Sequence, residues 1–62
     1  MNRQIKTFTV DCNTGESYII TLHGRDDMWS YNIDGQPERI GFNTSIAAAS
    51  DALLRILERG EK

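Results

Sequence analysis

Up to residue 42, hydrophobic and polar residues tend to alternate along the chain. A period of two residues is typical of β-strands that bury one face. The pattern predicts four strands, at about residues 5–11, 17–23, 28–33 and 38–42. Successive strands joined by short turns predict a single antiparallel β-meander.

Turn-forming residues separate these strands. Asn13-Thr14-Gly15 predicts a three-residue hairpin loop with Gly15 in the left-handed conformation, and residues 24–27 predict a four-residue turn. Asp34-Gly35 is typical of a two-residue type I′ hairpin turn. Pro37 lacks a backbone N–H, so we expect the fourth strand to lie at an edge of the sheet.

The predicted loop lengths set a register, and directly paired residues point to the same face of a sheet. This register pairs Val10 with Tyr18, Leu22 with Trp29, and Trp29 with Ile40. It collects the large apolar residues of the strands on one face as a core: Phe8, Val10, Tyr18, Ile20, Leu22, Trp29, Tyr31, Ile33, Ile40 and Phe42.

The segment at about 45–59 predicts an α-helix, because it is rich in alanine and Asn43, Thr44 or Ser45 can cap its start. Its large apolar residues recur at helical spacing and predict the buried stripe Ile46, Ala49, Leu53, Ile56 and Leu57. The expected fold is α+β, one domain over residues 1–62 with the helix packed on one sheet face and residues 60–62 frayed.

The other sheet face is expected to be uncovered and mostly hydroxyl and amide in character. It is either a solvated face or the surface that meets a partner. The first strand is an edge without proline, so strand addition or homodimer pairing there is an alternative. The candidate interaction face comprises Ile5, Thr7, Thr9, Ile19, Thr21, His23, Met28, Ser30, Asn32 and Arg39.

Length and composition exclude several classes of protein. A chain of 62 residues with one Cys and one His has no internal disulfide and too few ligands for a structural zinc site. No apolar run is long enough to cross a membrane, and the N-terminus lacks the apolar segment of a signal peptide. We therefore expect a cytoplasmic protein without metal, cofactor or membrane contact.

The charge distribution argues against nucleic acid as a partner. The net charge is −2, the central part of the chain is acidic, and no run of basic residues occurs. Binding to nucleic acid depends on several Lys or Arg side chains that meet phosphates. A protein partner, or a second copy of the chain, fits the charge pattern better.

The residues offer little for catalysis. His23, Asp26 and Asp27 form the one cluster of titratable groups, but Asp pairs are common in turns and a third metal ligand is missing. Cys12 is expected at the opposite end of the sheet from His23, which argues against a Cys–His pair. We therefore expect no enzymatic activity.

One family resemblance is carried by the segment from Trp29 to Ile33, then Gly35, the stretch Ile40–Thr44 and the alanine-rich helix. This segment resembles AP2-type and integrase N-terminal DNA-binding domains, which are small sheets backed by one helix. The resemblance implies DNA binding through Arg and aromatic residues on the open sheet face. Here that face offers one basic strand residue, Arg39, so the DNA-reading residues do not carry over.

The sequence therefore predicts a small non-enzymatic protein-interaction or regulatory module that acts through the uncovered sheet face or an edge strand. The alternative is a DNA-binding module with the architecture of AP2-type and integrase N-terminal domains.

Overall fold

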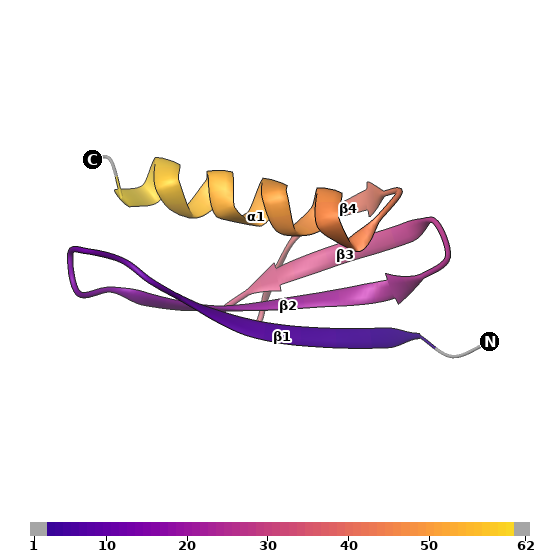
Figure 1. Cartoon of the computed structure of the whole chain (residues 1–62), viewed down its shortest axis with the longest axis horizontal. Coiled ribbons are helices and arrows are strands. Elements are labelled where there is room, and N and C mark those ends of the chain that lie inside the picture. The colour runs from indigo at the N-terminus through magenta and orange to yellow at the C-terminus, as the bar shows by residue number, and fades with distance from the viewer. Residues whose placement is uncertain (1–2, 61–62) are drawn as a thin grey trace.

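A computed structural model describes residues 3–60. These residues form one four-stranded antiparallel sheet, in the order β1-β2-β3-β4, with one helix on one of its faces (Figure 1). The elements are β1 (Gln4–Asp11), β2 (Ser17–Arg25), β3 (Met28–Ile33), β4 (Gln36–Phe42) and α1 (Ser45–Gly60). The predicted α+β meander is confirmed, and every predicted boundary is within two residues of the observed one. Gly60 is the last residue of α1, and residues 61–62 of the predicted frayed end lie outside the described part.

Two of the three predicted turns are confirmed. Cys12 donates its N–H to the carbonyl of Glu16, and Gly15 has a φ of 94° at the end of the loop between them. The β3–β4 turn has positive φ at both Asp34 and Gly35, as a type I′ turn requires. Val10 pairs with Tyr18, as the first loop predicts.

The second turn is shorter than predicted, because β2 and β3 continue to the pair Arg25 and Met28. Leu22 therefore pairs with Tyr31, two residues away from the predicted Trp29. A shift of two residues keeps every side chain on its predicted face. The predicted turn residue Gly24 lies within β2 opposite Trp29, where a Cβ atom would clash with the backbone of Met28.

The register of β4 differs from the prediction because two register shifts interrupt its pairing with β3. Trp29 pairs with Phe42, but the next residue of β3, Ser30, pairs with Ile40. Gly41 is left over between these pairs with a φ of 92°, which is typical of a β-bulge. The other shift leaves Glu38 over between the pairs Asn32–Pro37 and Tyr31–Arg39, and this extra residue moves Ile40, which is 82% exposed, out of the predicted core. The Gly41 bulge then returns Phe42 to the helix side opposite Trp29.

The core lies between α1 and the two central strands. The sheet contributes Ile20, Leu22, Trp29, Tyr31 and Ile33, and the helix contributes Ala48, Ala52 and Ile56. The predicted helix stripe is therefore largely wrong: Ile56 is buried and Ala49 is partly buried, but Ile46, Leu53 and Leu57 are exposed. Alanine faces the sheet because its small side chain allows the helix backbone to lie close to the large side chains of β2 and β3.

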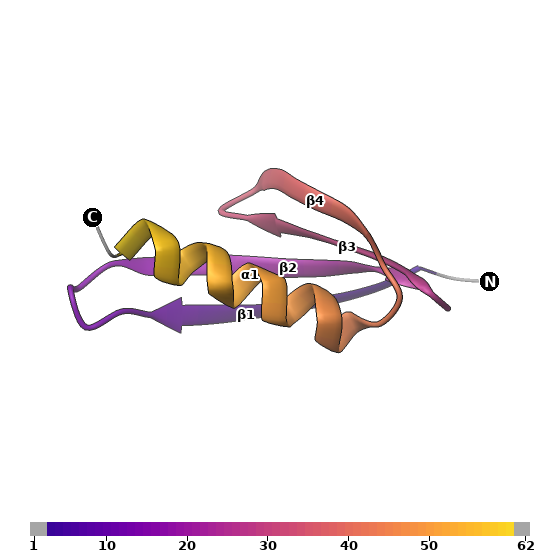
Figure 2. The ribbon, with the colours of Figure 1, turned by 90° about the horizontal axis from the view of Figure 1, so that it is seen from above.

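The helix starts at a side-chain cap and runs obliquely across the strands (Figure 2). The Thr44 hydroxyl accepts a hydrogen bond of 3.0 Å from the N–H of Ala47, which identifies Thr44 among the three predicted caps. α1 packs on β2, β3 and β4, whereas its Cα atoms stay more than 8 Å from those of β1. In Figure 1, β1 is the strand farthest from the helix.

Candidate functional site

The sheet face opposite the helix carries all the predicted interaction residues except Arg39. Its three central cross-strand rows are Ile5–His23–Ser30–Ile40, Thr7–Thr21–Asn32–Pro37 and Thr9–Ile19, and none of them contains a Lys, Arg, Asp or Glu side chain. The flanking rows each hold one charged residue, since Arg25 pairs with Met28 and Asp11 pairs with Ser17. The large apolar residues of this face are spread out, since Ile5 and Ile40 stand at opposite ends of one row.

Arg39 lies on the helix side of the sheet, so its predicted place on the open face is wrong. It pairs with the core residue Tyr31, and its Nη1 lies 3.4 Å from Oδ1 of Asp51 in α1. The physical reason is the bulged β4 strand, which turns Arg39 to the helix side and Ile40 to the open face. The open rows thereby lose the basic residue that the sequence assigned to them.

The polar groups singled out for catalysis lie apart. His23 contacts Asn32 Oδ1 at 3.3 Å through Nε2, and Nδ1 contacts the Arg3 guanidinium. Within residues 3–60, no group of three His, Cys, Asp or Glu side chains is placed to hold a metal ion. Cys12 follows the end of β1 at the first loop, whereas His23 pairs with Ile5 near the other end of the strand.

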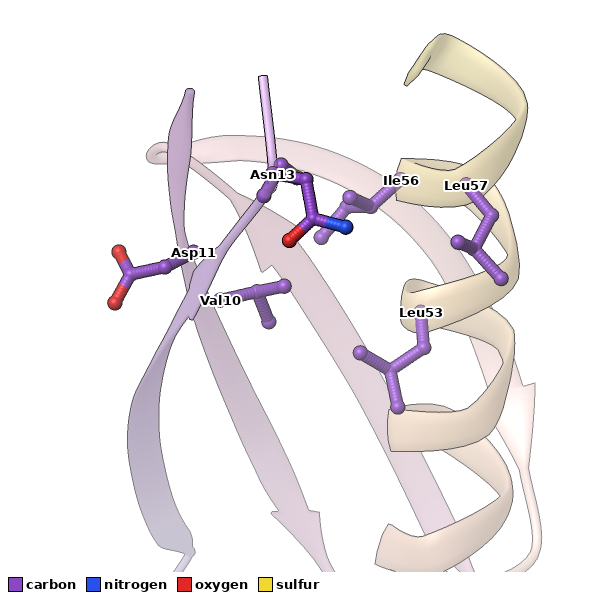
Figure 3. A pocket seen from close by; sticks show the side chains of 7 residues that line it. Val10, Asp11, Asn13, Leu53, Ile56 and Leu57 are labelled. Carbon is purple, nitrogen blue, oxygen red and sulfur yellow. The ribbon is translucent and has the colours of Figure 1, made fainter. Parts of the chain in front are cut away.

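A groove of about 360 Å³ separates the end of β1 from the C-terminal half of α1. Val10 and Leu53 point toward one another across it, while Asp11 points away to the other sheet face (Figure 3). The groove forms where the Cα atoms of α1 stay more than 8 Å from those of β1. Its lining residues are Val10, Asp11, Cys12, Asn13, Leu53, Ile56 and Leu57.

The helix continues the apolar wall of this groove toward its own start. Ile46, Leu53 and Leu57 are spaced by seven and four residues, which places them on one side of a helix. All three are exposed, at 77%, 41% and 60%. The sequence predicts these helix residues as part of the buried core. It therefore gives no sign that an open groove lies beside them.

The backbone of β1 offers a free edge beside this groove. Ile19 directs its N–H to the Asp34 carboxylate and its carbonyl to the Asp34 N–H, so it does not bond to its β1 neighbour Thr9. Hydrogen-bonded and non-bonded pairs alternate in antiparallel ladders. The N–H and C=O groups of Ile5, Thr7, Thr9 and Asp11 therefore point away from the sheet, and no further described strand pairs with them.

A polar cluster joins the helix to the sheet beside the core. The Tyr31 hydroxyl donates a 2.6 Å hydrogen bond to Oδ2 of Asp51, whose other oxygen faces Arg39. Burial and the hydrogen bond to Asp51 raise the pKa of Tyr31 to about 12. The same hydrogen bond, together with Arg39, lowers the pKa of Asp51. This cluster holds α1 in place, and its groups already have partners.

Comparisons with family models, curated proteins and solved structures yield no match to the chain. The described helix is too short and too polar to cross a membrane. The β1 edge and the groove together form one side of the molecule, which we name the β1 side.

Proposed function

We propose that the protein is a small non-enzymatic protein-interaction or regulatory module that binds its partner through the β1 side. The observation that carries the proposal is the position of α1, which leaves a groove beside β1 with exposed leucines on its helix wall and the partly buried Val10 and Cys12 on its β1 wall. Exposed apolar side chains that gather beside one another, unlike single ones, are typical of a surface that meets another molecule.

The β1 side offers two kinds of contact at once. The outward N–H and C=O groups of β1 can extend the sheet by one more strand, which gives affinity through main-chain hydrogen bonds. The groove next to that edge takes apolar side chains, which gives specificity. The open sheet face lacks this combination, because its apolar residues are scattered among threonines and amides.

The alternative of DNA binding rests on the sheet-and-helix pattern, and the placement of two arginines argues against it. Arg39 faces Asp51, and Arg59 donates a 2.9 Å hydrogen bond to Glu38. Both arginines thus form ion pairs at the surface that join α1 to β4. Phosphate contacts need cations directed outward from one surface.

The proposal is tested by capturing partners from the cell of origin with the tagged full chain. We expect the captured protein to be retained by Leu54→Lys and lost with Leu57→Lys. These two helix leucines are 59% and 60% exposed, but only Leu57 lines the groove. Because the two leucines are equally exposed, a difference between the two variants reports whether the residue lines the groove.

A third bait, Thr21→Arg, places a charge in the middle of the open sheet face. Loss of capture with Thr21→Arg alone would move the interaction to that face and contradict the β1 side. Capture that is unchanged by all three variants would contradict both surfaces. Circular dichroism of each bait shows whether it is folded.

A further inference from the structure

We infer that the occupant of the β1 side is a second copy of this chain, joined edge to edge through β1 about a two-fold axis. The inference rests on the proposed function for its choice of surface and adds the identity of the partner. The result is one continuous eight-stranded antiparallel sheet with both helices on the same face, since a two-fold axis perpendicular to the sheet preserves its faces.

The backbone of β1 is complementary to itself. Its outward groups belong to alternate residues, Ile5, Thr7, Thr9 and Asp11, and the register of β1 with β2 runs without a bulge. When two such strands pair antiparallel, outward residues meet outward residues and exchange both hydrogen bonds. The side chains on the helix side of β1 in one copy then lie beside those on the helix side of β1 in the other, on one common face of the combined sheet.

The opposite edge of the sheet is not suited to this pairing. β4 contains Pro37, which lacks an N–H, and two register shifts. Proline and bulges are the devices by which natural sheets block edge-to-edge association. β1 has neither of them over its eight residues.

Charge complementarity selects a second copy in antiparallel orientation. Arg3 precedes β1 and contacts His23 on the open face, and Asp11 ends β1 on that same face. Antiparallel pairing about the middle of the strand brings Arg3 of each copy beside Asp11 of the other. Parallel pairing would align like charges, which repel across a ladder. Lys6 takes no part in this pairing, because its ammonium points to the helix side, 5.9 Å from the centre of the Trp29 ring.

Apolar side chains gather where the two copies would meet. Phe8 and Val10 are half-buried on the helix side of β1, near the middle and end of the strand. The stripe Ile46, Leu53 and Leu57 stands over that side of the molecule and would be repeated by the second helix across the axis. Pairing thus covers apolar surface that one copy leaves exposed.

The test is the mass of the purified full chain by sedimentation, from low micromolar to millimolar concentration. We expect a dimer, and we expect Leu57→Lys to raise its dissociation constant by about tenfold or more, because the variant places a charge in an apolar contact. Leu54→Lys is the matched control and should leave the dimer intact. Thr7→Pro removes an outward N–H without removing a bond to β2, so it should also weaken the dimer.

Amide hydrogen exchange gives a second readout that does not depend on variants. In a β1-paired dimer the N–H groups of Thr7 and Thr9 are protected, and their protection falls on dilution. A monomer at every concentration, or a dimer in which these amides exchange freely, would overturn the inference. A monomer that captures another protein through Leu57 would overturn the second copy and leave the proposed function standing.

Discussion

At the scale of single residues, the contact between Tyr31 and Asp51 shows how this small core includes a polar group. Tyr31 is 1% exposed, yet its hydroxyl has a carboxylate acceptor at 2.6 Å. A buried hydroxyl without a partner would cost about 1–3 kcal/mol. Asp51 is therefore a structural residue, and the alternation of the strands gives no sign of its role because it is located in the helix.

This contact predicts a pH dependence with two limits. The pKa of Asp51 is lowered, so its contribution to stability is present at neutral pH and lost as the pH falls below the usual carboxyl range. The pKa of Tyr31 is raised to about 12, so stability is lost as the pH rises from about 10 through 12, where the unfolded tyrosine ionises first.

Urea unfolding across the pH range measures both limits. We expect Tyr31→Phe to cost about 1 kcal/mol at pH 7, to flatten the alkaline loss and to weaken the acid loss. Asp27→Asn, at an exposed position in the β2–β3 turn, is the matched control for a carboxylate. An alkaline limit that persists in Tyr31→Phe would show that another group sets it.

At the scale of elements, the strands and two of the turns follow from the sequence because they depend on local chemistry. The two-residue period and the Asp34-Gly35 turn are visible in the sequence without any tertiary contact. The second turn was predicted too long, because Gly24 is equally suited to a turn and to the tight place it occupies in β2. The predicted faces of β2 and β3 are still correct, because the error in their register is two residues.

β4 and α1 differ from the prediction for tertiary reasons. Extra residues at Glu38 and Gly41 interrupt the pairing of β4 with β3, and alternation cannot distinguish this from a regular strand. The helix has alanines on one side and leucines on another, so its amphipathic pattern has two solutions. The larger leucine side chains led to the prediction that they form the core. In the structure α1 packs closely on the sheet, and this close packing places the alanines in the core.

The packing of α1 predicts opposite outcomes for two size changes. Ala52 is fully buried against the sheet, so Ala52→Leu should overpack the core and cost about 1–3 kcal/mol or more. Leu57 of the predicted stripe is 60% exposed, so Leu57→Ala should change stability by less than about 1 kcal/mol. Urea denaturation of both variants measures the difference. A larger loss with Leu57→Ala would return the predicted stripe to the core.

At the scale of the whole molecule, one asymmetry links the fold to its proposed function. The Cα atoms of α1 approach those of β2, β3 and β4 within 8 Å but not those of β1, so a groove is left beside this edge of the sheet. The sequence identified β1 as a candidate edge from the absence of proline. It could not identify the groove beside it, because the groove arises from where α1 settles on the sheet.

The positions of the charges allow a direct test between the two proposed partner classes. Arg39 and Arg59 form ion pairs with Asp51 and Glu38 that join α1 to β4, and the three central rows of the open face carry no formal charge, whereas the flanking rows hold Arg25 and Asp11. With a net charge of −2, the chain should pass through heparin or DNA columns unretained at about 0.1 M salt. The variant Thr21→Arg/Ser30→Arg adds two cations to the open face and is the positive control for weak retention. Retention of the unmodified chain that falls steeply with added salt would favour the DNA-binding alternative, since counterion release gives that dependence and apolar contact does not.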